Sequence, residues 1–327
     1  MKSLKVALGT CAAAVGLAFS PAAMSAFQTA VQVNWDGIAG YDTLDIVEFD
    51  WQSTGDLAIK NTLPSLQTFN LTAAGQAANG GALTKDYSTF SSWATDAQSG
   101  YIVLGQTITY TLHAQSRLND MIDGGGSIKP PTLDANGAVG GDAGFEITVA
   151  VSGNETARLD SNTKITFLSV SGMTYAFFLD QTPDSDVLNG TGFTDGTNFL
   201  SGDVVLASGE FDSGGSIPGG SSRFANSVTS YLDTIIETDP LSNKPLVGST
   251  FNTDIAFAGT LDDQVKVGGT IGLANYTVVT GDLILKTDAD SQFFAEPTVT
   301  VPEPGSILLM GAGLLGLAAG ARRKLKA

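Results

Sequence analysis

Apolar and polar residues alternate in short runs along most of the chain. A period of two places successive side chains on opposite faces of a β-strand. Val, Ile, Thr, Phe and Tyr, which suit a pleated sheet, are abundant in these runs. The pattern predicts strands at residues 44–51, 66–71, 101–112, 145–151, 164–170, 173–179, 204–211, 254–257, 264–271 and 276–286.

Turn-forming residues separate the predicted strands. Clusters of Gly, Asn, Asp and Ser stand at residues 124–127, 136–137, 140–142, 195–196 and 214–220. Such residues supply the positive φ angles that hairpin turns require. We therefore expect an all-β fold, an antiparallel β-sandwich of jelly-roll or immunoglobulin-like type, for a single body domain at residues 26–300.

Two segments depart from the alternation and suggest short helices. Apolar residues recur at helical spacing between residues 222 and 237, so this segment predicts one amphipathic helix packed on the sandwich, although its Thr and Ile content also permits a strand. The residues concerned are Phe224, Val228, Tyr231, Leu232, Ile235 and Ile236. Tyr87, Phe90 and Trp93 suggest either a shorter helical turn or a loop with packed aromatic rings.

The N-terminal residues have the features of a secretory signal peptide. Lys2 and Lys5 precede an apolar run at residues 6–19, and small residues follow at 22–26. Cleavage after Ser25 leaves small residues at both recognition positions, which predicts a signal peptide at residues 1–25. An uncleaved anchor is the alternative, but it needs about 20 apolar residues. Cys11, the single cysteine, would leave with the signal, which excludes disulfides and thiolate chemistry in the mature protein.

The C-terminal residues 301–327 form a tail with three parts. Pro302, Glu303 and Pro304 come first. We expect this segment to be extended, because proline is excluded from a helix interior and restricts the residue before it. An apolar run follows at residues 307–321, and its helix would span about 22 Å, less than the roughly 30 Å hydrocarbon core. A basic cluster, expected on the cytoplasmic side, ends the chain with Arg322, Arg323, Lys324 and Lys326.

This tail resembles the PEP-CTERM sorting signal of Gram-negative bacteria. The proline motif, the apolar helix and the basic end occur together and in the family's order, in a chain that also begins with a signal peptide. The resemblance implies a transient anchor in the inner membrane, processing by an exosortase-type enzyme, and release to the cell surface or extracellular matrix. It also implies an association with exopolysaccharide, flocs or biofilm. An ordinary single-span anchor is the alternative.

Charge and composition exclude several classes of binding partner and of catalytic chemistry. The segment 27–301 holds 10 basic and 32 acidic residues, a net charge of −22. This charge repels phosphate backbones and excludes nucleic acid as a partner. The single histidine, His113, has no recognisable catalytic neighbours, and no nucleophile elbow, phosphate loop or dinucleotide motif occurs. A carbohydrate-active enzyme with two paired carboxylates stays open, because that chemistry needs only two placed acids.

Calcium is the one cofactor that the sequence suggests. Asp180, Asp184 and Asp186 concentrate short oxygen-bearing side chains in a turn-rich segment, and Asn189 and Asp195 follow closely. Calcium binds six to eight oxygens, although the spacing does not match an EF-hand. The alternative is a solvated acidic loop.

These observations favour an exported, noncatalytic surface or matrix protein. The first alternative is a carbohydrate-active enzyme, and the second is a calcium-stabilised adhesion module.

Overall fold

The computed structural model describes residues 31–33, 44–123, 126–128, 145–180, 183–214, 219–232, 235–237, 247–258 and 264–293. These belong to one compact unit, Gln28–Glu296. The helices are α1 (Ala73–Ala78) and α2 (Phe90–Gln98). The strands are β1 (Val31–Val33), β2 (Leu44–Ile46), β3 (Glu48–Ile59), β4 (Thr62–Asn70), β5 (Thr84–Thr89), β6 (Thr107–Asp123), β7 (Gly126–Ile128), β8 (Glu146–Leu159), β9 (Lys164–Asp180), β10 (Thr197–Asp212), β11 (Gly219–Tyr231), β12 (Ile236–Glu237), β13 (Thr250–Ala258), β14 (Thr270–Ile271), β15 (Tyr276–Thr277) and β16 (Leu283–Phe293).

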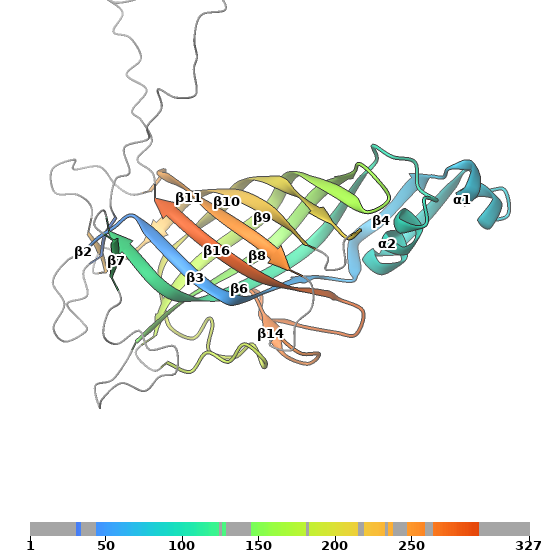
Figure 1. Ribbon diagram of the computed structural model, residues 1–327. Coiled ribbons are helices and arrows are strands. Elements are labelled where there is room, and N and C mark those ends of the chain that lie inside the picture. Colours follow the sequence, from blue (N-terminus) through green and yellow to red (C-terminus); the bar gives the residue numbers. More distant parts are fainter. Residues whose placement is uncertain are drawn as a thin grey trace, which may run out of the picture. The chain divides into compact units, whose positions relative to one another are not determined.

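Eight long strands close into an antiparallel barrel (Figure 1). Their order is β3, β16, β13, β11, β10, β9, β8 and β6, and β6 then pairs back to β3. The all-β, antiparallel prediction is confirmed, but the strands form a barrel in place of the expected sandwich. Alternation reports which face of a strand is buried, and both architectures bury one face of every strand. The pairing of β3 with β6 closes the sheet on itself, and this closure distinguishes the barrel from a sandwich.

Several predicted strands are pieces of longer ones. The runs at 164–170 and 173–179 join into β9, which passes through Gly172 at a φ of 56°. Opposite this point, a register irregularity lies between Ser152 and Asn154, where a Cβ on Gly153 would come 2.2 Å from the Cα of Met173. An irregularity of this kind interrupts the alternation without ending the strand. By contrast, the runs at 264–271 and 276–286 contain only β14, β15 and the start of β16.

The helix predicted at residues 222–237 is wrong, because residues 219–231 form β11. Phe224, Asn226 and Val228 are buried, and the residues between them are half-buried. A spacing of four residues keeps side chains on one face in a helix and also in a strand, since four is a multiple of two. The apolar spacing was therefore ambiguous, and pairing with β10 and β13 decided the outcome.

The second helical suggestion is confirmed in part. Tyr87 lies on β5, whereas Phe90 and Trp93 lie on α2 and their rings pack 5.6 Å apart. Thr89 caps this helix by accepting a hydrogen bond from the backbone N–H of Ser92. The helix lies at the end of the barrel from which β4 leaves (Figure 1).

A cluster of aromatic side chains packs inside the barrel. Phe49, Trp51, Phe177 and Phe251 pack mainly edge to face, with ring centroids 5.0–5.9 Å apart. The indole N–H of Trp51 donates to the hydroxyl of Ser291 at 2.8 Å, so this buried polar group is satisfied. The burial of large rings on the inward positions accounts for a stable body without disulfides.

Two further segments cover part of the outer barrel face. The turn at residues 183–196 is joined to the β14–β15 hairpin by backbone hydrogen bonds, including one from Thr270 to Asn189. Val265, Ile271 and Val278 of the hairpin segment pack on Ala58 of β3. These contacts hold the segment after β9 against the barrel, and they position the acidic cluster described next.

Candidate functional site

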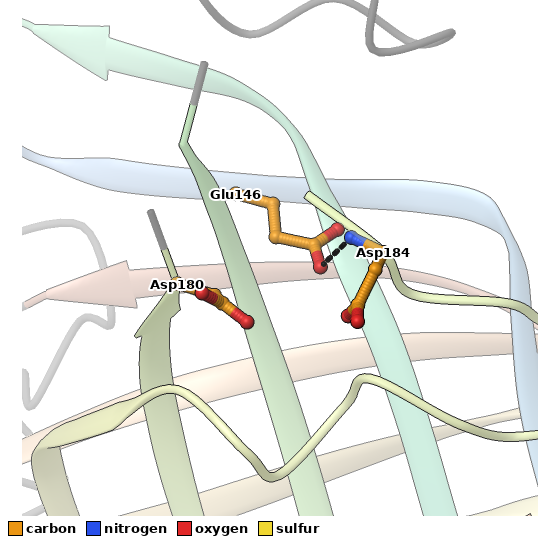
Figure 2. A group of neighbouring side chains, drawn as sticks. All are labelled: Glu146, Asp180 and Asp184. Atoms are coloured by element: carbon orange, nitrogen blue, oxygen red, sulfur yellow. Dashed lines mark hydrogen bonds between the residues drawn. The ribbon is translucent and has the colours of Figure 1, made fainter. Parts of the chain in front are cut away.

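Three carboxylates meet where β8 begins and β9 ends. Glu146 is the first residue of β8, Asp180 is the last residue of β9, and the two are register partners. Asp184 follows in the next turn, and one oxygen from each carboxylate lies within 4.8 Å of the others. Figure 2 shows the three side chains converging from these segments.

Glu146 holds the turn onto the barrel. Its side chain is buried, and its Oε1 accepts hydrogen bonds from the backbone N–H groups of Asp184 and Ser185, each at 2.9 Å. Its Oε2 accepts a hydrogen bond from the hydroxyl of Ser185 at 2.6 Å. The Arg117 guanidinium lies 4.0 Å from the same oxygen and compensates part of the charge. Glu146 therefore has a structural role whether or not a cation binds beside it.

Asp180 and Asp184 complete the cluster. The pKa of Asp184 is raised, first by partial loss of hydration and then by the negative charges of Asp195 and Asp180. A cation between these carboxylates would relieve that repulsion. Calcium suits such oxygen ligands, and its remaining coordination positions would be filled by backbone oxygens or water.

Asp186, the third ligand in the sequence prediction, lies outside this group. Its Oδ1 accepts hydrogen bonds from the backbone N–H groups of Leu188 and Asn189, and its Oδ2 accepts one from the Asn189 side chain. The Asn189 side chain is also the main cause that lowers the pKa of Asp186. The residue thus closes the turn at 186–191, as short acidic side chains commonly do.

Glu146 is the member of the cluster that the sequence prediction missed. It lies 34 residues before Asp180, and only the antiparallel pairing of β8 with β9 brings the two together. A signal was available: Glu146 stands between Phe145 and Ile147 in an apolar strand. A buried acid in such a position needs partners.

His113 contributes to packing. Its ring stacks on Tyr276 with centroids 4.6 Å apart, and its Nδ1 lies 2.9 Å from the Ser152 hydroxyl. Burial, together with the nearby charge of Lys60, lowers the pKa of His113 to about 4. The imidazole is therefore neutral at pH 7. Its contacts with Tyr276 and Ser152 join the β14–β15 hairpin to the barrel.

The sorting residues of the tail lie outside the described residues. These are Pro302, Glu303, Pro304, Arg322, Arg323, Lys324 and Lys326, together with the apolar run at 307–321. Within the described part of the chain, neither helix has the length and apolar character needed to cross a bilayer.

Comparisons with known proteins identify the tail alone. Residues 300–324 match the PEP-CTERM protein-sorting motif. No curated protein and no solved structure matches the chain. The resemblance found in the proline motif, the apolar run and the basic end is thus confirmed, and the chain carries a PEP-CTERM protein-sorting motif that marks it as an exported protein sorted by an exosortase-type enzyme.

Proposed function

We propose that the body is a noncatalytic module of the cell surface or extracellular matrix that associates with exopolysaccharide. The sorting motif at residues 300–324 is the observation that carries this proposal, because it directs the protein to the place where such polymers lie. The apolar run at 307–321 serves as a transient inner-membrane anchor before exosortase acts.

The barrel surface supports contact with a polymer through polar groups. Among the described residues, the exposed large apolar side chains are Leu and Val, so sugar rings would meet few aromatic stacking platforms. Hydroxyls, amides and carboxylates of the outer face would provide the hydrogen bonds. The chain has a net charge of −17, so an acidic polysaccharide would require bridging cations.

The hydrogen bonds of Asp282 support a noncatalytic role. Glycoside hydrolysis requires two carboxyl groups that flank the scissile bond. Glu155 and Asp282 both line a cavity of the barrel. However, Asp282 accepts hydrogen bonds from the backbone N–H groups of Asn61 and Val279 and from the Tyr276 hydroxyl. These contacts give Asp282 a structural task in the loops at the barrel end.

Substitutions in the motif test the sorting step and its link to the matrix. In the native host, Glu303→Ala with Pro304→Ala should leave the protein in the membrane fraction and reduce its content in the matrix at least tenfold. Glu296→Ala with Pro297→Ala is the matched control, because the same residue pair lies just outside the motif. Intact mass and terminal sequencing of the surface and medium fractions provide the measurement. Equal release of both variants would contradict the role of the motif.

A second experiment tests the body itself. The host without this protein should lose floc or biofilm mass, and expression of the wild-type chain should restore it. Purified body protein should also sediment with the host's exopolysaccharide and leave the polymer's length unchanged. Unchanged flocs and matrix in the deletion strain would contradict the proposal, and shortening of the polymer would favour the carbohydrate-active alternative.

Calcium binding is a second candidate function, favoured by the convergence of Glu146, Asp180 and Asp184. A ligand that binds only the folded state must stabilise it, by about 2.7 kcal/mol at a hundredfold excess over Kd. Calcium should therefore raise Tm, and chelator should reverse the change. Asp180→Asn should abolish this response, whereas Asp288→Asn, an exposed carboxylate on β16, should preserve it. A Tm that is the same in calcium and in chelator would remove the candidate.

A further inference from the structure

The barrel contains a large cavity at the end covered by α2. Its volume is about 350 Å³, which lies at the lower end of the range for small-molecule sites. The lining comes from the ends of β3, β6, β8, β9, β10, β13 and β16, and from one side of α2. Eight-stranded barrels have an interior of the size that accommodates one small ligand.

Most of the cavity wall is apolar. Leu57, Leu112, Phe167, Phe257 and Leu285 are among the side chains that line it. Because these residues lie on different strands, an apolar molecule would be surrounded on several sides. Burial from water would then provide the main driving force for binding.

Several polar side chains also line the cavity, and two of them have a buried atom without a partner in the described part of the chain. Glu155 on β8 and Trp93 on α2 line the cavity, and both are nearly fully buried. Among the described residues, no group forms a hydrogen bond with Oε1 of Glu155 or with Nε1 of Trp93. Buried polar atoms are rarely left without a partner in native proteins, so each of these two atoms indicates a role.

The second oxygen of Glu155 is held in place. The Tyr110 hydroxyl, on the register partner of Glu155 in β6, donates to Oε2 at 2.6 Å. This bond fixes the carboxyl group and leaves Oε1 as its free acceptor. Burial raises the pKa of Glu155 to about 7, and burial beside Glu155 also raises the pKa of Tyr110 well above its usual range.

Helix α2 is attached to the barrel rim at both of its ends. At its start, the backbone N–H of Phe90 donates to the carbonyl of Asn61 at 2.6 Å, and that of Ser91 donates to the Asn61 side chain at 3.0 Å. At its end, the Gln98 side chain donates to the Ser213 hydroxyl at 3.4 Å. These contacts keep Trp93 over the cavity.

We propose that this cavity binds a small apolar molecule that carries one uncharged hydroxyl group, with Glu155 and Trp93 as its hydrogen-bond partners. A hydroxyl can donate to Oε1 of Glu155 and can accept from the indole N–H of Trp93, so one kind of ligand group suits both atoms. A carboxylate ligand would be repelled by Glu155 and Asp282. An ammonium ligand has no acceptor for Trp93.

Two isomeric probes test the proposal on the exported protein, purified from culture medium without detergent. These are 1-octanol and 1-methoxyheptane, which have the same heavy atoms but differ in the hydroxyl donor. Calorimetric titration should give a Kd for 1-octanol at least about tenfold lower, as expected for loss of one buried hydrogen bond. Equal affinities would overturn the role of the hydroxyl, and absence of binding by either probe would overturn the site. Tighter binding of octylamine than of 1-octanol would overturn the inference that the ligand is uncharged.

Substitutions locate the binding in the cavity. Ala94→Phe adds a ring from α2 into the cavity lining and should abolish binding of 1-octanol, whereas Ala256→Phe adds the same ring at an exposed position on β13. Trp93→Phe keeps an aromatic ring without the N–H and should weaken the binding of both probes several-fold, because the hydroxyl oxygen and the ether oxygen both accept a hydrogen bond. The Trp93→Phe comparison decides the matter if Ala94→Phe does not fold. Unchanged binding of 1-octanol by folded Ala94→Phe or by Trp93→Phe would overturn the proposal.

Discussion

Asp290 lies in a row of carboxylates that crosses four neighbouring strands. Asp120 pairs with Asp50, Asp50 pairs with Asp290, and Asp290 pairs with Asp254. Partial burial, followed by the negative charges of Glu48, Asp50, Asp288 and Asp254, raises the pKa of Asp290 to about 6. The folded state therefore holds a proton that the unfolded chain releases above about pH 4, so this residue's contribution to stability falls as pH rises from about 4 to 6.

Replacing this carboxyl should stabilise the protein at neutral pH. A shift of two pKa units corresponds to about 2.7 kcal/mol, which partial exposure reduces to about 1 kcal/mol. We expect Asp290→Asn to raise Tm at pH 7.5 by about 2–4 °C, and to have little effect at pH 4. Thermal unfolding monitored by circular dichroism measures both values. Asp203→Asn, on the exposed side of β10, is the control, and a lower Tm for Asp290→Asn at pH 7.5 would contradict the prediction.

At the scale of elements, the turn at 186–191 and the β14–β15 hairpin depend on one glycine. Gly190 has a φ of 67°, and a Cβ at this position would come 1.6 Å from the carbonyl oxygen of Thr270. The Thr270 hydroxyl donates to the Gly190 carbonyl at 2.9 Å. A side chain here would separate the two segments and disturb the adjoining carboxylates.

Gly80 provides a matched comparison for this position. Its φ of 66° is nearly the same, but a Cβ there would meet no atom within 4 Å. Gly80→Ala should therefore cost about 1 kcal/mol of unfolding free energy from backbone strain alone. Gly190→Ala should cost at least 2 kcal/mol more, because the carbonyl of Thr270 has to move. Urea unfolding gives both values, and equal costs would show that the contact with Thr270 is unimportant.

At the scale of the whole molecule, closure of the barrel gives each of the eight strands two neighbours. In β3, Asp56, Leu57, Ala58 and Ile59 have register partners on both β16 and β6. Successive backbone N–H groups of an antiparallel strand point to opposite sides, so both neighbours are needed to bond them all.

Hydrogen exchange should therefore be slow at consecutive amides of β3. We expect residues 56–59 to exchange within about tenfold of the amides in β9, because both strands open only with the barrel. The control is β5, which belongs to a two-stranded sheet and should show alternating fast and slow amides. A similar alternation in β3 would indicate an open sheet and would contradict closure.

Prediction from the sequence succeeded where the signal was local. The alternating runs located most of the long strands, and the aromatic group at residues 87–93 indicated α2. It failed at β11, because Phe224 and Val228 share a face in a helix and in a strand alike. For the acidic cluster, proximity in the sequence suggested Asp180 and Asp184 together with Asp186, whereas Glu146 joined them only through the pairing of β8 with β9.

The amino-acid sequence alone determined the sorting address and the all-β character of the body. Both are local properties. The sorting signal is recognised from the order of its proline motif, apolar run and basic end, and a strand is recognised from the alternation that places its apolar side chains on one face. The tertiary structure decided barrel closure, the meeting of Glu146 with Asp180, and the cavity between α2 and the barrel. These depend on which distant strands pair and in which register. That choice follows from the packing of the whole core, which no short segment contains.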